Sequence, residues 1–477
     1  MVDRKDADVV EGPDGAFASL HSDFVDGGAS QSYIDEKKLL RKTDLHVVPI
    51  LFLVYLAAFL DRVNVSNALT MGLPAELGLE GQQTNIALCI FFVPYIIFEV
   101  PSNVLMKKLN PHVWLSACIL VFGIIMIAQG FVKSYSGLLA TRFFLGLAEA
   151  GIFPGSFYLI SFWYKKEESQ KRFTVYWSST ILAGAFGGLL ASAIGNMGGI
   201  RDLSSWRWVF ILEGIATVLI GILAFFCITD FPREAKWLTP EERIFVLNKI
   251  KNDESRGVPV TTKDVFAFLG TAKAWFGAIM YFSILVTSYS LSYFTPTIIQ
   301  TLGYSTIQTQ LHSVPPFAAA FGFAVVLAYF SDRVRMRSPF IFLGLALLIT
   351  GLSILITTHG KSHFSAEYAG ICLTAMGSFG IGGMIICWYV MNLWGHVERS
   401  IGTAWMIGFG NCGGIVATFL FEKKDAPYYH TGYTTCLSMG CLCIASCAGY
   451  ALYIWRQKKA TYVSGKEGVE MERVLYF

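Results

Sequence analysis

Apolar runs long enough to cross a lipid bilayer recur along most of the chain. A helix needs about 20 residues to span the ~30 Å hydrocarbon core, and twelve runs offer stretches of this kind. Six precede a polar stretch at residues 230–272, and six follow it. The runs cover residues 45–69, 85–106, 112–131, 138–162, 172–195, 207–229, 273–298, 311–330, 339–357, 366–393, 400–421 and 433–455. The sequence therefore predicts an all-α polytopic membrane protein with twelve transmembrane helices in two six-helix bundles.

The even division of these runs sets the expected domain plan. We expect a disordered cytoplasmic tail at 1–44, one bundle at 45–229, a cytoplasmic linker at 230–272, a second bundle at 273–455 and a cytoplasmic tail at 456–477. The linker contains apolar residues at helical spacing after Pro240, which predicts an amphipathic helix on the membrane surface. Two similar bundles are typical of secondary transporters, whose substrate site lies between them near the bilayer midplane.

Composition and charge exclude several other classes. Apolar residues make up 54% of the chain and charged residues only 15%, which is unlike a soluble globular protein. The net charge of +3 is spread over short loops, so we expect no nucleic-acid partner. No metal-ligand pair, nucleotide-binding lysine motif or catalytic triad stands out. We therefore expect no enzyme activity and no cofactor, with a proton gradient as the energy source, and we expect a monomer in the bilayer.

The distribution of Lys and Arg among the short loops indicates the orientation. The loops on the side of both termini carry more of these residues than the opposite loops. Because retained Lys and Arg mark the cytoplasmic side, we expect a multi-pass protein of the plasma membrane with both termini in the cytoplasm.

Charged residues inside the apolar runs are the main candidates for function. The first span must continue through Asp61, Arg62 and Asn64 to be long enough to cross the bilayer. In the fourth span Arg142 and Glu149 are seven residues apart, which places them on one helix face. Charges at this depth are costly and are usually functional.

These charges support two interpretations. In the functional one, Asp61 or Glu149 carries a proton, because burial disfavours the charged carboxylate whereas a nearby arginine favours it. Arg62 or Arg142 then binds an anionic substrate, since the planar guanidinium matches a carboxylate. In the structural one, the four residues form a charge network that fixes helix packing without contacting the substrate.

Two further acids lie in apolar runs. Glu99 stands between Pro94 and Pro101, and Glu213 lies in the sixth span, where it could neutralise a neighbouring arginine. We assign both to structural or gating roles.

The second bundle has few charges at depth and offers aromatic and amide groups instead. We expect these groups to surround the body of a small ligand, as in other binding pockets. Tyr289 and Tyr293 share a helix face. Together with Asn64 of the first span, the neutral candidates for substrate binding are Tyr289, Tyr293, Trp388, Asn392 and Asn411. The glycines at 408, 410 and 413 spell GxGxxG, but no strand precedes them, so we interpret them as sites of close helix packing.

Several segments together resemble a known family. They are LDRVNVSNA in the first span, FEVPSNVLMKKLNPHVWL across the second and third, RFFLGLAEAGIFPG in the fourth, WRWVFILEG at the start of the sixth and YFTPTIIQTLGYS at the end of the seventh. The pattern resembles the major facilitator superfamily and, within it, the fungal allantoate permease-like branch of the anion:cation symporter group. Nicotinate-type permeases look most similar.

One signature of that superfamily is altered here. The loop between spans two and three normally reads G-x-x-x-D-R-x-G-R, yet Asn103 occupies the first glycine position and Lys107 the aspartate position. The later copy, after span eight, keeps Asp332 and Arg333. The resemblance therefore implies that a gating contact lies in the second loop.

The resemblance also implies an activity. Family members use intramembrane carboxylates for proton coupling and arginines for organic anions, which maps onto Asp61, Arg62, Arg142 and Glu149. We therefore expect proton-coupled import of a small carboxylate such as nicotinate, allantoate or pantothenate by alternating access. The alternative is proton-driven export of drugs or secondary metabolites by the same fold.

Overall fold

The structure is a computed structural model that describes residues 35–251, 261–334, 336–358 and 363–465. Contacts divide the chain into a short unit ending at Lys42 and a compact unit that begins at Thr43. Every contact and cavity discussed below lies in the second unit. The residues of the expected tails at 1–34 and 466–477 lie outside the described residues.

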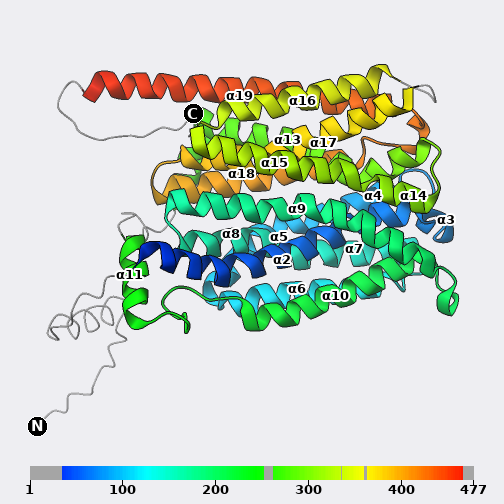
Figure 1. Ribbon diagram of the computed structural model, residues 1–477, viewed down its shortest axis with the longest axis horizontal. Helices are drawn as coiled ribbons and strands as arrows, with labels where there is room; N and C mark the ends of the chain where they lie inside the picture. The colour runs from blue at the N-terminus through cyan, green and yellow to red at the C-terminus, as the bar shows by residue number, and fades with distance from the viewer. Residues whose placement is uncertain (1–34, 252–260, 335, 359–362, 466–477) are drawn as a thin grey trace, which may run out of the picture. The chain divides into compact units, whose positions relative to one another are not determined.

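The described chain is all-helical (Figure 1). Eleven of its segments are long and apolar enough to cross a membrane. The helices before the linker are α2 (Glu36–Thr70), α3 (Leu73–Glu76), α4 (Gln83–Cys89), α5 (Phe92–Lys108), α6 (Pro111–Gln129), α7 (Tyr135–Glu149), α8 (Ile152–Trp163), α9 (Lys166–Ile194) and α10 (Ser205–Cys227). We call α2 to α10 the N-terminal half.

The linker and the rest of the chain continue the pattern. The linker contains α11 (Pro240–Lys251) and α12 (Thr262–Leu269). The C-terminal half consists of α13 (Ala272–Thr301), α14 (Thr306–His312), α15 (Val314–Val334), α16 (Ser338–Thr357), α17 (Phe364–Met391), α18 (Gly395–Thr418) and α19 (His430–Gly465). The expected all-helical polytopic fold is confirmed.

Eleven of the twelve expected spans are among these candidates. The run at 400–421 does form a helix, α18, but it is not among the eleven candidate spans. Its glycines, together with Glu398, Arg399 and Asn411, keep the hydropathy of α18 below that of the apolar stretches in the eleven candidate spans. Packing against neighbouring helices therefore has to compensate for its low hydropathy.

Helix ends also differ from the ends of the apolar runs. Helix α2 begins at Glu36, within the stretch expected as a tail, and α19 continues to Gly465. A helix satisfies its own backbone hydrogen bonds, so it can extend beyond the membrane-spanning residues into water.

Proline explains why three spans are each built from two helices. Pro94, Pro154 and Pro315 lie in the first turn of α5, α8 and α15, directly after α4, α7 and α14. Proline lacks the N–H that a continuous helix would need at that point but fits the first turn of a new one. These breaks redirect the chain within the spans.

Helices pack first within each half. In the N-terminal half α6 contacts α10 and α7, and α5 contacts α7. In the C-terminal half α13 contacts α17, α18 and α19, and α16 contacts α17 and α19, as the ribbon shows for α16 and α19 (Figure 1). The two halves meet where α9 contacts α14, α15 and α17 and where α5 contacts α18.

Glycines permit the closest of these contacts. A Cβ at Gly184 of α9 would lie 2.5 Å from the Phe317 ring, and one at Gly188 would lie 2.7 Å from the Gln310 carbonyl oxygen. In α18, a Cβ at Gly410 would overlap the Tyr281 ring. Two of the three glycines in GxGxxG, Gly410 and Gly413, thus pack against α13.

Candidate functional site

Arg62 of α2 is at the centre of the site. Its side chain is 1% exposed, and its Nε donates to both carboxylate oxygens of Glu149 at 3.0 and 3.1 Å. A further bond joins Arg62 Nη2 to Glu149 Oε1. This multidentate geometry holds the charge pair in the interior of the protein, because Glu149 is also fully buried.

The same guanidinium reaches the C-terminal half. Arg62 Nη1 donates to the Tyr289 hydroxyl at 2.7 Å, and that hydroxyl donates to Asn411 Oδ1 at 3.3 Å. A continuous polar chain therefore runs Glu149, Arg62, Tyr289 and Asn411, and joins α7, α2, α13 and α18. Any relative movement of the two halves must break or rearrange it.

Aromatic rings enclose the Arg62 charge. The guanidinium carbon lies 5.1 Å from the centre of the Phe91 ring and 4.9 Å from that of the Tyr95 ring. Both distances are typical of cation–π contact, which stabilises a desolvated cation. The sequence pattern does not single out these residues, although Tyr95 lies one helical turn before Glu99.

Arg142 has donors without partners. Its Nη1 donates to the Arg62 carbonyl oxygen at 3.4 Å, whereas Nε and Nη2 are buried with no hydrogen-bond partner. Buried N–H groups of this kind are costly when unpaired. Arg142 thus differs from Arg62, whose charge is neutralised by Glu149.

Asp61 and Glu213 belong to a ladder between α2 and α10. The Thr217 hydroxyl donates to Asp61 Oδ2 at 2.7 Å, and Asn64 Nδ2 donates to Glu213 Oε2. Each acid keeps one buried oxygen without a partner, Oδ1 of Asp61 and Oε1 of Glu213. The hydrogen-bond partner of Glu213 is thus Asn64 rather than a neighbouring arginine. Glu99 likewise has one unpartnered buried oxygen.

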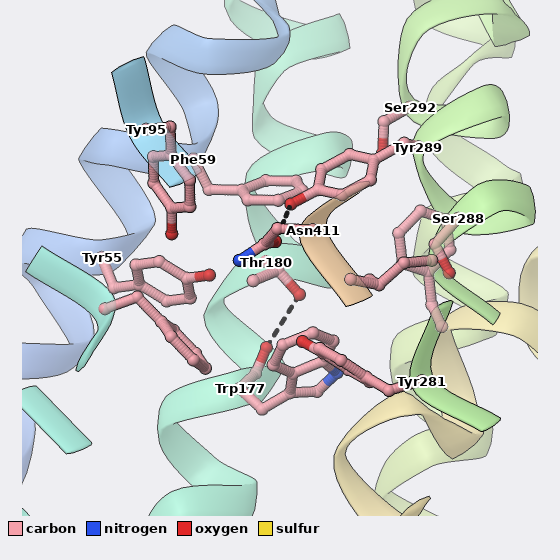
Figure 2. A pocket seen from close by; sticks show the side chains of 13 residues that line it. Tyr55, Phe59, Tyr95, Trp177, Thr180, Tyr281, Ser288, Tyr289, Ser292 and Asn411 are labelled. Atoms are coloured by element: carbon pink, nitrogen blue, oxygen red, sulfur yellow. Dashed lines mark hydrogen bonds between the residues drawn. The ribbon is translucent and has the colours of Figure 1, made fainter. Parts of the chain in front are cut away.

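A cavity lies between the halves next to Arg62 (Figure 2). Tyr55 and Tyr95 lie on one side, Tyr281 and Tyr289 on the other, and Asn411 between them. Its volume of about 10 Å³ is close to that of one water molecule. A larger ligand can enter only if side chains or helices move.

The other expected binding residues lie in different places. Tyr293 stacks on Tyr289 with ring centres 6.1 Å apart. Trp388 packs edge-on against Tyr450, and Asn392 donates to the Trp388 carbonyl oxygen. Neither Trp388 nor Asn392 is among the residues that line the cavity, because both lie near the far end of α17.

The two expected gating residues, Asp332 and Arg333, have different surroundings. Arg337 Nη2 donates to Asp332 Oδ1 at 3.2 Å, while Arg333 is exposed. The side chains of Asn103 and Lys107, in the altered loop, are not described.

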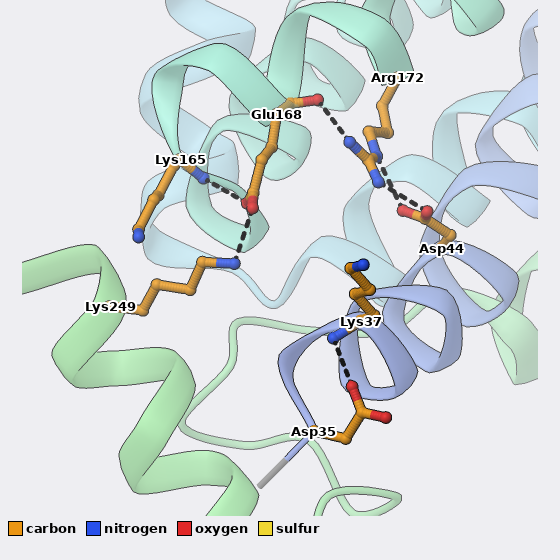
Figure 3. Close-up of polar contacts among 7 residues, drawn as sticks. All are labelled: Asp35, Lys37, Asp44, Lys165, Glu168, Arg172 and Lys249. Atoms are coloured by element: carbon orange, nitrogen blue, oxygen red, sulfur yellow. Dashed lines mark hydrogen bonds and ion pairs between the residues drawn. The ribbon is translucent and has the colours of Figure 1, made fainter.

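Ion pairs tie α2 to α9 and α9 to α11 (Figure 3). Arg172 donates to both oxygens of Asp44 at 2.8 and 2.7 Å, and Lys249 donates to Glu168 at 2.8 Å. The linker helix α11 is thus held against the start of α9, so movement of that end can be transmitted along the linker.

Comparison with known proteins identifies the fold family. The profile described as Major Facilitator Superfamily matches residues 51–418. The chain belongs to the major facilitator superfamily. It is a multi-pass membrane transporter, and a transported small molecule is implied by this membership.

Fungal relatives of this superfamily cover most of the chain. The MFS transporter prlL of Fungal sp. (strain NRRL 50135) is 32% identical and covers 94% of each chain. The high-affinity nicotinic acid transporter of Saccharomyces cerevisiae is 29% identical over 87% of this chain and 77% of its own. Both are transporters, which confirms the expectation that the chain is not an enzyme.

A solved structure supports the fold. A bacterial homologue of the human lysosomal transporter Spinster, in an inward-facing and occupied conformation, superposes with a TM-score of 0.64 at 14% identity. The match covers 86% of this chain and 96% of that one.

Proposed function

We propose that this superfamily member imports a small organic anion together with protons across the plasma membrane, with both termini in the cytoplasm. The observation that carries the proposal is the buried Glu149–Arg62 ion pair, which continues through Tyr289 to Asn411 in the other half. In this proposal Glu149 is a proton acceptor and Arg62 an anion-binding group, and their direct contact lets the charge of each affect the other.

Coupling follows from competition for the guanidinium. A charged Glu149 occupies Arg62, so a substrate carboxylate arriving there meets a neutralised cation. Protonation of Glu149 removes its charge and leaves Arg62 to bind the substrate. A buried arginine without an anion is strongly unfavourable, so substrate and proton must bind together for the site to remain neutral.

Arg142 and Asp61 supply a second cation and a second acid. The unpartnered Nε and Nη2 of Arg142 are donors for a carboxylate substrate. Asp61, held by Thr217, offers one buried oxygen to a proton. We assign Asp61 and Glu149 to proton coupling and Arg62 and Arg142 to the anion.

The substrate class rests on two supports. A relative that covers most of the chain is a nicotinic acid transporter. The cavity walls combine tyrosines with Asn411, which suits a flat ring bearing a carboxylate. We therefore place the chain in the allantoate permease-like branch, with nicotinate as the first candidate and allantoate and pantothenate as others.

Uptake of radiolabelled carboxylates, with nicotinate first, tests the proposal in cells that express the chain. We expect uptake that rises at acidic external pH and disappears with a protonophore. The Glu149→Gln variant should lose uphill uptake but keep exchange of substrate across the membrane. Full uphill uptake by this variant would exclude Glu149 as the proton carrier. Faster efflux than in control cells would instead support the export alternative.

A further inference from the structure

A second cavity lies at the end of the molecule where α2 and α13 finish. It has a volume of about 420 Å³ and is lined by residues from the end of α2, from α3 and α4, from the end of α13 and from the segment between α18 and α19. We call this cavity the vestibule. In the orientation proposed above it opens to the outside of the cell.

The vestibule has the size of a ligand site. Small-molecule pockets are typically about 300–1,000 Å³, whereas the central cavity next to Arg62 is about 10 Å³. In this conformation, therefore, a molecule the size of nicotinate fits the vestibule and not the centre.

Charge in the vestibule favours an anion. Lys423 is the one charged residue among those that line it. Its neighbour Lys424 is paired with Glu422 at 2.6 Å, and the nearby Arg207 is paired with Glu76 at 2.8 Å. The lining thus carries one positive charge and no carboxylate.

The walls suit a flat organic body. The rings of Phe294 and Phe421 stack with centres 5.2 Å apart, and Tyr429 lies 5.6 Å from Phe421. Thr297 and Gln300, about one and two turns further along α13 than Phe294, add neutral hydrogen-bonding groups. Aromatic walls with a few polar groups are characteristic of binding sites for small molecules.

Polar contacts between the halves border the vestibule. Asn85 Nδ2 donates to the Thr418 carbonyl oxygen at 2.5 Å, and Gln310 Nε2 donates to Thr70 Oγ1 at 2.8 Å. Thr70 also lines the vestibule and donates to the Asn67 carbonyl oxygen. Asn67 in turn donates to Asn64, the partner of Glu213. A hydrogen-bonded path therefore leads from the vestibule along α2 to a buried acid.

We propose that the vestibule is an outer binding site for the organic anion, in which Lys423 binds the carboxylate and Phe294, Phe421 and Tyr429 contact the ring. The proposal rests on the proposed function, because it takes the same substrate class. The site captures substrate before the contacts at Asn85 and Gln310 open towards Arg62. Changes in the vestibule should therefore alter the half-saturating concentration for uptake more than the maximal rate.

Kinetics of nicotinate uptake test the role of Lys423. We expect Lys423→Gln to raise the half-saturating concentration about fivefold or more, with the maximal rate nearly unchanged at equal surface expression. Lys423→Arg should retain most of the affinity. Lys424→Gln is the matched control, because it removes the same charge from the same segment but takes it from a residue already paired with Glu422. Equal effects of Lys423→Gln and Lys424→Gln would overturn the proposal.

Labelling of the vestibule tests occupancy directly. The Thr297→Cys variant should react with a membrane-impermeant methanethiosulfonate, above the background of the native cysteines in the parent protein. Nicotinate should slow this reaction, with weaker protection when Lys423→Gln is added and full protection when Lys424→Gln is added. No protection by nicotinate would overturn the outer site.

The two proposals fail in different ways. Absence of uptake of every carboxylate in the panel by the parent protein would contradict the proposed function, whereas labelling of the Thr297→Cys variant would still decide whether the vestibule binds the anion.

Discussion

The two halves of the molecule use buried polar groups differently. Among the described residues, the N-terminal half buries seven charged side chains, Asp61, Arg62, Glu99, Arg142, Glu149, Arg207 and Glu213, and the C-terminal half buries only Lys273. Around the central cavity the C-terminal half contributes neutral groups such as Ser288, Tyr289 and Asn411. In the function proposed above, the N-terminal half would carry the protons and the charged groups, while the C-terminal half would contribute neutral groups around the ligand.

The largest effect should come from breaking the Arg62–Glu149 pair. We expect Arg62→Gln to reduce uphill nicotinate uptake at least about 100-fold, because removal of one partner of a buried pair costs about 3–5 kcal/mol. The double variant Arg62→Gln with Glu149→Gln should recover folded protein, measured as monodisperse material after solubilisation, but not uphill uptake. Recovery of uphill uptake in the double variant would show that the pair is only structural.

A smaller effect should follow from cutting the link between the halves. Tyr289→Phe removes the hydroxyl between Arg62 and Asn411, and hydrogen bonds to charged groups contribute about 1.5–3 kcal/mol. We expect the half-saturating concentration for uptake to rise about tenfold. Tyr293→Phe is the control, because Tyr293 stacks on Tyr289 but its hydroxyl is not part of this chain of bonds. Equal kinetics for the two variants would contradict the assigned division of roles.

The α2–α10 ladder should affect stability within the N-terminal half. Thr217→Val removes the donor to Asp61 and leaves a buried acceptor unpaired, at a cost of about 1–3 kcal/mol. The apparent melting temperature of the solubilised protein should fall. The control is Thr180→Val, whose hydroxyl donates only to a carbonyl one turn away in its own helix. An equal fall in both variants would mean that the ladder has no special role.

The smallest effect should be at Glu76, outside the spans. Burial raises the pKa of Glu76, but hydrogen bonds from Ser204, Trp206 and Arg207 outweigh it and hold the pKa below its usual range. The stabilisation is therefore present above the ordinary glutamate pKa of about 4.3 and is lost as the pH falls through the lower pKa of the folded state. Because Glu76 is partly exposed, we expect less than about 1 kcal/mol.

Melting curves across this acidic range would measure the Glu76 effect. The Glu76→Gln variant should be slightly less stable than the parent at neutral pH and should approach it under acid. A difference that stays constant with pH would exclude the carboxylate as its cause.

Much of the fold was predictable because its strongest constraint is local. Each apolar run must satisfy its backbone within the bilayer, which leaves a helix as the solution for a single segment. The same local constraint predicted that Asp61, Arg62, Arg142 and Glu149 lie within the membrane-spanning segments. It also predicted the helix at α18, although glycines and Asn411 lower the hydropathy of that segment. It did not indicate how far α2 and α19 extend.

The sequence by itself determined that this chain is a helical membrane transporter with charges in its N-terminal half. Only the tertiary structure decided which charges meet. Arg62 pairs with Glu149, 87 residues away, and with Tyr289, 227 residues away, while its neighbour Asp61 turns to Thr217 on another helix. Periodicity fixes which residues share a helix face, but the rotation and depth of each helix against its neighbours depend on packing between distant segments. For that reason Tyr289 and Asn411 reach the site while Trp388 and Asn392 lie elsewhere.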